Sequence, residues 1–378
     1  MTCATTAANA DAVPVPPGEV IAHSPAATRV YLGSPSLALL PNGDYVASFD
    51  TFGAAAAPNR VSVFTSHDKG ATWSRLADVR DQYWSSLFVL NGALYLMGTN
   101  RSMGTPSIRR SDDGGASWTT PVDASTGRLP YPGRFITGPV PVLVDRGRVW
   151  RAYESVDGGD LRAMVLSAPV DRDLLDARNW RMSAHLPSDK RWLDGKFQSW
   201  EEGNVVGRPG AAPVVMLRVN TANGPEQAAL VTTSADGRTL SFDPMRDFVD
   251  LPGAGKKFTI RFDPQSKQYW TITNAVPKNV GPMNLERVRN TLVLLSSPDL
   301  RQWAARRILL QHADATRHGF QYVDWQFDGS DLVAVLRVAF DDPEGGAASQ
   351  HDSNFITFLR VRRFRENAAS HALTQGLQ

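Results

Sequence analysis

Charged, amide and aromatic residues gather in short groups that recur along this sequence of 378 residues. The groups are Tyr83-Trp84, Arg134-Phe135, Glu201-Glu202, Lys256-Lys257 and Gln321-Tyr322. Carboxylates, tyrosines and histidines can transfer protons, and arginine or lysine can hold an anionic group. Aromatic rings offer flat apolar faces for stacking. If the fold brings these groups together, they suit the binding or cleavage of a sugar.

A repeated turn motif indicates the fold that would position them. The pattern S-x-D-x-G-x-[ST]-W, which we call an Asp box, occurs at residues 66–73 and 111–118. Partial copies begin at Ser167, Ser234 and Ser297. The Asp and Ser side chains can accept hydrogen bonds from amides of their own turn, and Gly allows a positive φ. Asp68 and Asp113 are therefore predicted to stabilise turns and to take no part in catalysis.

Each Asp box follows a pair of strands joined by a tight turn, such as Ser36–Leu40 with Tyr45–Ser48. The unit is strand, hairpin, strand, loop, strand, Asp-box turn and strand, which makes one four-stranded blade. Six units run from Ser34 to about Arg365. The sequence thus predicts an all-β propeller with six blades, although the count leaves room for a seventh, more diverged blade. The segment Glu19–Ala22 is expected to close the ring as an outer strand.

The expected organisation is a disordered tail over residues 1–19, one propeller domain over 20–366 and a C-terminal tail over 367–378. Cys3 is the only cysteine, so no intrachain disulfide can form. It is either the lipid-bearing cysteine of an exported lipoprotein or an incidental residue. We expect an exported protein, periplasmic or extracellular, that is monomeric.

Composition excludes several function classes. Lys and Arg number 40 against 38 Asp and Glu, a net charge of +2 that gives no reason to expect a nucleic-acid partner. No apolar run approaches the ~20 residues needed to span a bilayer. Neither a phosphate-binding loop nor zinc-ligand spacing is present. The expected partner is a small saccharide or a glycan terminus.

Propeller topology predicts which face holds the site. The first strand of each blade is innermost, so its start converges with the end of the second strand on the face opposite the Asp-box turns. Trp84, Arg134, Glu202 and Tyr322 occupy corresponding places in four different blades and are the strongest candidates.

Longer phrases carry a resemblance to a known family. They are His23-Ser24-Pro25, Gln82 to Ser86, Glu202-Gly203-Asn204, Lys257 to Ile260, His318 to Trp325, and His351-Asp352 with Asn354. With the Asp boxes, they resemble the sialidase-like superfamily and, within it, the propellers that include L-rhamnose-α-1,4-D-glucuronate lyases. The resemblance implies an exo-acting carbohydrate-active enzyme that cleaves rhamnosyl-glucuronate by a lyase reaction. The resemblance implies that the enzyme requires no cofactor, and it suggests a structural calcium ion on the propeller axis.

A lyase needs a cation for the uronate carboxylate, a base for the C5 proton and an acid for the leaving oxygen. The catalytic candidates are His23, Tyr83, Arg134, Glu202 and His318. The substrate-binding candidates are Asp50, Trp84, Arg101, Asn204, Lys256, Asn274, Arg289, Gln321, Tyr322 and His351.

Two departures from the family keep other functions open. Phe49 and Ile136 stand where the lyase relatives have histidine. One alternative is a glycoside hydrolase with a carboxylate pair, drawn from Asp50, Glu154, Glu201, Glu202 and Asp324. Another is a sugar-binding propeller without catalysis. True sialidases use three arginines with a Tyr/Glu pair, but no register of Arg29, Arg101, Arg134, Arg287, Arg289 and Arg337 makes three of them that set.

Overall fold

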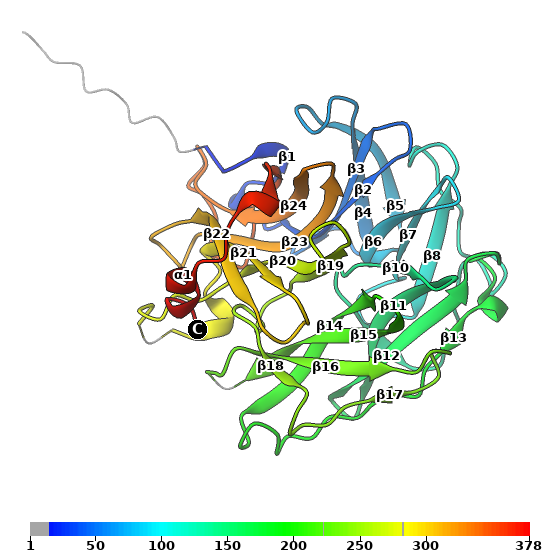
Figure 1. Ribbon diagram of the computed structural model, residues 1–378. Coiled ribbons are helices and arrows are strands. Elements are labelled where there is room, and N and C mark those ends of the chain that lie inside the picture. Colours follow the sequence, from blue (N-terminus) through cyan, green and yellow to red (C-terminus); the bar gives the residue numbers. More distant parts are fainter. Residues whose placement is uncertain (1–14, 222, 282) are drawn as a thin grey trace, which may run out of the picture.

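Six antiparallel sheets form the blades of a propeller in the computed structural model, which describes residues 15–221, 223–281 and 283–378 (Figure 1). First strands of neighbouring blades contact one another in five of the six pairs, so these strands surround the axis. Six blades confirm the count predicted from the sequence.

The strands of the first three blades have the following bounds. Blade 1 contains β2 (Tyr31–Leu39), β3 (Tyr45–Phe52), β4 (Arg60–Ser66) and β5 (Ser74–Arg80). Blade 2 has three strands, β6 (Tyr83–Leu90), β7 (Ala93–Thr99) and β8 (Pro106–Ser111). Blade 3 contains β10 (Leu143–Asp145), β11 (Arg148–Asp157), β12 (Asp160–Pro169) and β13 (Arg181–Met182), and β9 (Arg134–Ile136) also pairs with β11.

The other three blades complete the ring. Blade 4 contains β14 (Phe197–Arg208), β15 (Ala211–Thr221), β16 (Gln227–Thr233) and β17 (Leu240–Ser241), with β18 (Phe248–Asp250) beside β16. Blade 5 contains β19 (Thr259–Asp263), β20 (Gln268–Asn274), β21 (Thr291–Ser297) and β22 (Ala304–Gln311). Blade 6 contains β23 (Gly319–Asp328), β24 (Asp331–Ala339), β25 (Phe355–Val361) and β1 (Glu19–His23).

Strand β1 closes the ring as predicted. It pairs antiparallel with β25, with Glu19 opposite Phe358 and His23 opposite Phe355. The N-terminal strand therefore completes the last blade, and the two ends of the ring are held by a backbone ladder.

Buried tryptophans fill four successive blades. Trp150, Trp200, Trp270 and Trp325 are at most 2% exposed. Each indole N–H donates a hydrogen bond, for example from Trp200 to the Leu161 carbonyl at 2.9 Å. A large apolar ring whose single polar group is satisfied can be buried between sheets at little cost.

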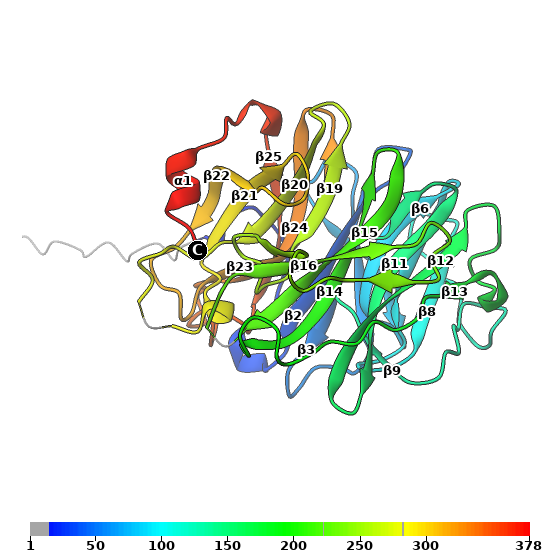
Figure 2. The same ribbon diagram turned by 60° about the horizontal axis from the view of Figure 1, so that its bottom comes forward.

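Short helices occupy a few connections and the C-terminus. The 3₁₀ helices are η1 (Ala26–Thr28), η2 (Ala177–Asn179), η3 (Leu285–Arg287) and η4 (Phe364–Glu366). The expected C-terminal tail contains helix α1 (His371–Gln375), which packs against β22 (Figure 2). Residues 1–14, with Cys3 and most of the expected disordered tail, lie outside the described residues.

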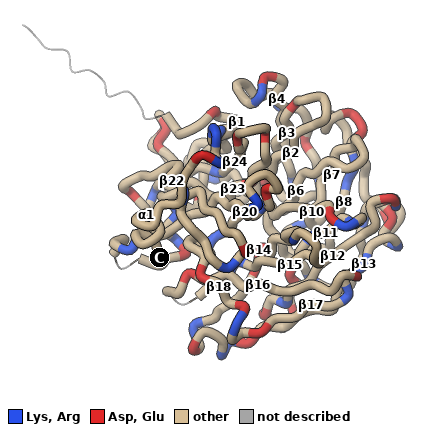
Figure 3. Tube along the Cα trace, viewed as in Figure 1, with Lys and Arg blue, Asp and Glu red and all other residues tan. Residues whose placement is uncertain are grey.

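Charged residues of both signs are interspersed along the chain (Figure 3). None of the helices in the described residues is both long and apolar enough to cross a bilayer.

The Asp boxes have the predicted internal hydrogen bonds. In the first box, Asp68 accepts from the Thr72 amide and hydroxyl at 2.9 and 2.6 Å, and Ser66 Oγ accepts from the Gly70 amide at 2.8 Å. Asp113 and Ser111 make the same bonds in the second box. These acidic residues hold turns together, as the sequence predicted.

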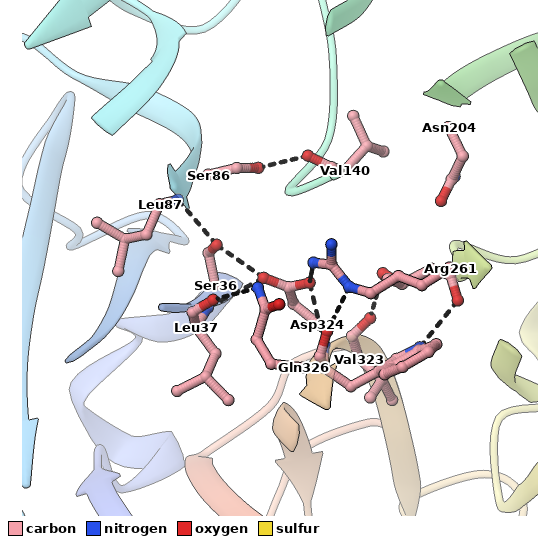
Figure 4. Close-up of polar contacts among 12 residues, drawn as sticks. Ser36, Leu37, Ser86, Leu87, Val140, Asn204, Arg261, Val323, Asp324 and Gln326 are labelled. Atoms are coloured by element: carbon pink, nitrogen blue, oxygen red, sulfur yellow. Dashed lines mark hydrogen bonds and ion pairs between the residues drawn. The ribbon is translucent and has the colours of Figure 1, made fainter. Parts of the chain in front are cut away.

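Hydrogen bonds between side chains and backbone join neighbouring first strands around the axis (Figure 4). Ser36 Oγ accepts from the Leu87 amide of blade 2 at 2.9 Å and donates to Asp324 of blade 6 at 2.8 Å. Asp324 also accepts from the Leu37 amide at 3.0 Å. Ser86 Oγ donates to the Val140 carbonyl of blade 3 at 2.7 Å. Blades 6, 1, 2 and 3 are thus joined in sequence.

The same kind of bond joins the remaining blades. Glu154 of blade 3 accepts from the Gly203 amide of blade 4 at 3.1 Å, and Asn204 Oδ1 accepts from the Ile260 amide of blade 5 at 3.0 Å. Thr259 Oγ1 donates to the Val323 carbonyl of blade 6 at 2.8 Å. We call this set of bonds the axial belt.

Replacing Asp68 or Asp113 with alanine should lower the midpoint of thermal unfolding, because each change removes the bonds that close its turn. Asp171→Ala is a matched control, since Asp171 is exposed and makes no hydrogen bond in the described residues.

Bonds from Thr72 and Ser117 lower the pKa of Asp68 and Asp113 to about 2. The stabilisation is therefore present above pH 3.8, the ordinary pKa, and should be lost as the pH falls towards 2. A variant as stable as Asp171→Ala would contradict the structural role of the turn.

Candidate functional site

The same backbone irregularity occurs in four first strands. The pairing register of β2, β6, β14 and β23 shifts by one residue near the start of each strand. At each shift one residue has a positive φ: Ser34 (44°), Trp84 (48°), Glu202 (54°) and Tyr322 (57°). A β-bulge re-aims a side chain, and a non-glycine residue in this conformation costs about 1–3 kcal/mol, which is characteristic of functional sites. Three of the four strongest sequence candidates occupy this position.

Glu202 forms a buried ion pair with Arg218 of β15. Arg218 Nη1 lies 2.9 Å from Glu202 Oε2 and 3.4 Å from Glu201 Oε1, and Nε donates to the Gly255 carbonyl at 3.0 Å. Burial alone would lower the pKa of Arg218, but the two carboxylates hold it well above its usual value. The Glu202 carboxyl is also packed against Gly138, where a Cβ would lie 3.0 Å from Glu202 Cγ.

Tyr322 lies against two further buried arginines. The guanidinium carbon of Arg337 is 4.0 Å from the centre of the Tyr322 ring, and that of Arg289 is 5.9 Å away. Gln321 holds the two cations together, since its Oε1 accepts from Arg289 Nη1 and, at 3.3 Å, from Arg337 Nη2. Burial and the charge of Glu202 raise the pKa of Tyr322 to about 12, against the opposing effect of the three arginines.

Two of the three arginines, Arg289 and Arg337, form no ion pair with a carboxylate in the described residues. Within the described residues, no carboxylate oxygen lies within 4.0 Å of a nitrogen of Arg289 or Arg337. Burial lowers the pKa of Arg289 to about 9, and the nearby Arg337 and Arg218 act in the same direction. Two like charges without counter-ions in a buried place favour the binding of an anion.

Asp50 of β3 lies near enough to Arg337 for the two charges to interact. Its Oδ2 accepts from the Trp84 amide at 2.9 Å, and the residue is 2% exposed. Burial raises its pKa to about 6, although the bonds from Trp84 and Ser34 and the charge of Arg337 oppose the rise. The Tyr83 ring lies next to Trp84, and its pKa is raised first by burial and then by Asp50.

His351 lies at the edge of this cluster. Its ring is 5.3 Å from that of Phe52, and burial together with the charge of Arg337 lowers its pKa to about 4. The imidazole is therefore neutral at physiological pH and is suited to hydrogen bonding more than to anion binding.

Other predicted site residues have structural partners. Lys256 pairs with Glu226 at 2.7 Å and donates to the Leu285 carbonyl at 3.1 Å. Both polar atoms of Asn204 bind the backbone of blade 5, and Asn274 Nδ2 donates to the Phe320 carbonyl at 2.6 Å. These side chains stabilise loops and blade contacts, and the structure gives them no free group directed at the cluster.

Four more candidates make no hydrogen bond or ion pair with Arg218, Arg289 or Arg337 in the described residues. His23 lies on the outermost strand of blade 6, paired with Asp342 at 3.0 Å. His318 lies between Asp314 and Asp341, 3.3 Å from each. Arg134 is exposed and contacts Met103 Sδ at 2.6 Å, and Arg101 is exposed on the loop after β7.

The sequence interpretation missed Arg218 and gave Arg337 no role. Both lie on second strands, each paired with the residue that precedes a bulge: Arg218 with Glu201 and Arg337 with Gln321. Of the six arginines considered from the sequence, only Arg289 and Arg337 contact Tyr322, and the third arginine of the site, Arg218, was not among them. Arg218, Arg289 and Arg337 surround Tyr322 and Glu202, and we call these five residues the arginine cluster.

The suggested axial calcium ion does not fit the residues present. The described residues contain no group of three or more His, Cys, Asp or Glu side chains that could hold a metal ion. Asp324, the acidic residue of the axial belt, already accepts hydrogen bonds from Ser36 and Leu37 and lies 3.3 Å from Arg261 (Figure 4). A guanidinium beside this carboxylate opposes a second cation.

A cavity of ≈ 450 Å³ lies at the end of the axis towards the Asp-box turns. Its lining includes Val142, Val205, Ile260 and Phe262, together with the turns at Arg146 and Gly210. This hollow has a mixed lining, which also includes Asp145, Arg208 and Arg261, whereas the arginine cluster lies by the bulges of the first strands. We place the candidate site at the arginine cluster, since convergent charges and strained backbone are found there.

Comparisons with known proteins support the fold. No protein-family model matches the chain, and no curated protein sequence does. The structure is similar to an α-L-arabinanase of Penicillium chrysogenum complexed with arabinobiose, with a TM-score of 0.56 and 15% identity over 93% of this chain and 99% of that chain. An α-L-arabinofuranosidase mutant of Fusarium graminearum, bound to an iminosugar inhibitor, has a TM-score of 0.58 and 13% identity over 91% and 97%. The haemagglutinin-neuraminidase of parainfluenza virus 5 has a TM-score of 0.54 and 10% identity over 93% of each chain. At such low identities, the structural similarity shows a shared fold alone.

Arg218→Met should destabilise the protein by about 3–5 kcal/mol, because it leaves the Glu202 carboxylate buried without its cation. Adding Glu202→Gln should recover part of this loss, since the uncompensated charge is then removed. Chemical denaturation of the two single variants and the double variant measures the coupling. Purely additive effects would show that the two side chains do not form the pair described here.

Proposed function

We propose that the protein is a glycoside hydrolase that releases an acidic sugar from the end of a glycan. The observation that carries this proposal is the arginine cluster, in which a tyrosine lies against two arginines without carboxylate partners and interacts electrostatically with a Glu–Arg pair. The hydrolase supersedes the lyase as first choice, since His23 and His318 have structural carboxylate partners away from the cluster.

The acidic group of the sugar would bind Arg289 and Arg337. Guanidinium groups recognise carboxylates through paired hydrogen bonds, and these two are fixed side by side by Gln321. Binding would supply the counter-charge that the cluster lacks, so the carboxylate would contribute much of the affinity. Trp84 and Tyr83 are placed to form an apolar wall for the sugar ring.

Tyr322 is the proposed nucleophile. Its phenolic oxygen attacks the anomeric carbon while its proton passes to Glu202, because a phenol with a pKa near 12 is a weak nucleophile without a base. A neutral nucleophile also avoids the repulsion that a carboxylate would experience beside an acidic sugar. The bond from the anomeric carbon to the leaving oxygen breaks in the same step.

Asp50 is the proposed acid. Its raised pKa of about 6 keeps a fraction of it protonated near neutrality, so it can give its proton to the leaving oxygen. In the second step Asp50 accepts a proton from water, the resulting hydroxide displaces Tyr322 from the anomeric carbon, and Glu202 returns its proton to the phenolate. Because the acid must be protonated, the rate should fall as the pH rises above about 6.

The similar structures support a saccharide ligand. One is an arabinanase bound to arabinobiose, and another is a neuraminidase with the same fold. Neither shares enough sequence to carry its substrate over to this chain, so the acidic sugar rests on the charges of the cluster.

The proposal predicts turnover of chromogenic glycosides of acidic sugars, glucuronic acid and neuraminic acid among them, and much slower turnover of the matching glucoside. Tyr322→Phe should abolish turnover while keeping the fold, because the phenolic oxygen is lost. Arg337→Met should weaken binding of glucuronate at least tenfold, whereas Arg134→Met, an arginine change on the exposed rim, should leave it unchanged.

Other outcomes identify the alternatives. An unsaturated uronate product, seen by its ultraviolet absorbance, would indicate a lyase. Saccharide binding without turnover, equal in the Tyr322→Phe variant, would indicate a binding propeller. Equal loss of glucuronate affinity in Arg337→Met and Arg134→Met would contradict the assigned anion site.

A further inference from the structure

Two carboxyl groups share one guanidinium beside the bulge of blade 4, and a third lies near them. Arg218 pairs with Glu202 and Glu201, and Glu154 of β11 lies behind them. Glu154 is fully buried, whereas the Glu201 side chain is 23% exposed. Arg218 already pairs with two carboxylates, so the carboxyl farthest from water and without an arginine bond is the one expected to hold a proton.

The contacts of Glu154 connect it to the proposed base. Its Oε1 accepts a hydrogen bond from the amide of Gly203, the residue that follows Glu202 in the bulge. Its Oε2 has no partner in the described part of the chain. A Cβ at Gly203 would meet Val215 at 2.7 Å, so the chain has little room to move at this point.

We propose that Glu154 is a positioning residue whose neutral carboxyl group holds the Gly203 amide and thereby fixes the bulge that directs Glu202 towards Tyr322. The inference deepens the proposed function, on which its ligand-binding consequences rest. Glu154 has no surface exposed to solvent and does not touch the substrate; it acts through the backbone of its neighbour.

The electrostatics of the surroundings agree with this role. Burial raises the pKa of Glu154 to about 8, and the charges of Glu201 and Glu202 add to the rise, while the amides of Gly203 and Glu202 oppose it. The other charged group facing it is Arg151, on its own strand. Ionisation of Glu154 would place a second negative charge behind Glu202 and repel it from its position.

The expected pH dependence of stability follows from the direction of the shift. The ordinary pKa is 4.5 and the folded value is about 8, so the folded state retains a proton that the unfolded state releases. The stabilisation is present below pH 4.5 and is lost as the pH rises to about 8. Glu154→Gln, which imitates the neutral acid, should not show this loss.

The first experiment measures thermal unfolding of wild type, Glu154→Gln and Glu366→Gln between pH 5 and 9, with Glu366 as an exposed control. Wild type should lose stability relative to Glu154→Gln as the pH rises to 8, and Glu366→Gln should follow wild type. Parallel curves for wild type and Glu154→Gln would overturn the proposal, because Glu154 would then ionise as it does in the unfolded chain.

The second experiment measures D-glucuronate affinity over the same range. With a pKa of about 8, only about one tenth of the wild-type protein is in the neutral form at pH 9, so its affinity should be about tenfold lower than at pH 6. Glu154→Gln should show only the roughly twofold decline expected when Arg289, with a pKa of about 9, loses half its charge at pH 9. Glu154→Ala should bind weakly at both pH values because it cannot hold the Gly203 amide.

The two proposals fail in different ways. If wild type does not bind glucuronate at any pH, the proposed function is contradicted, and the unfolding curves still decide the protonation of Glu154. If glucuronate binds and Glu154→Gln loses affinity with pH as wild type does, the positioning role is contradicted and the hydrolase is not.

Discussion

The hydrogen bonds of the axial belt hold the propeller together at its narrowest part. Each blade buries apolar side chains against the next, but apolar packing has no direction and does not fix how deep one blade sits relative to another. Ser36, Ser86, Asn204 and Asp324 supply that direction, because each binds the backbone of a neighbouring first strand. Every one of them lies two residues after a bulge residue.

The bulges connect the architecture to the site. A bulge turns its positive-φ residue out of the sheet register, and the residue two places later returns to the register and joins the belt. Strain at Glu202 and Tyr322 is therefore maintained by hydrogen bonds that also determine the spacing of the blades. The same arrangement brings together residues from three blades, although they are far apart in the chain, and leaves Arg289 and Arg337 buried without carboxylate partners. The ring is closed by pairing of β1 with β25, and Gln321 accepts hydrogen bonds from both cations.

Repeating local chemistry made most of the fold predictable. Asp-box turns, hairpin turns and alternating strands are determined by neighbouring residues, and they correctly predicted the blades and the ring closure. They also predicted that Trp84, Glu202 and Tyr322 occupy equivalent positions in three different blades. The second strands were less predictable. A bulge shifts the register by one residue, and the sequence gives no sign of it, so Arg218, which pairs with the residue before the bulge, was not considered. Histidines were overvalued for their chemistry, since His23 and His318 lie beside carboxylates that the sequence places far away from them. Asn204 and Asn274 were selected as polar residues near the axis, but polar residues there are also needed for contacts between blades.

The two ends of the axis offer different environments, with a cavity of mixed lining towards the Asp boxes and the arginine cluster towards the bulges. A crystal structure of the protein soaked with D-glucuronate distinguishes them. We predict that the sugar binds on the bulge side, with its carboxylate bound to Arg289 and Arg337 and its anomeric carbon facing Tyr322. A sugar seated only in the cavity lined by Val142, Val205 and Ile260, with the arginine cluster empty, would contradict it.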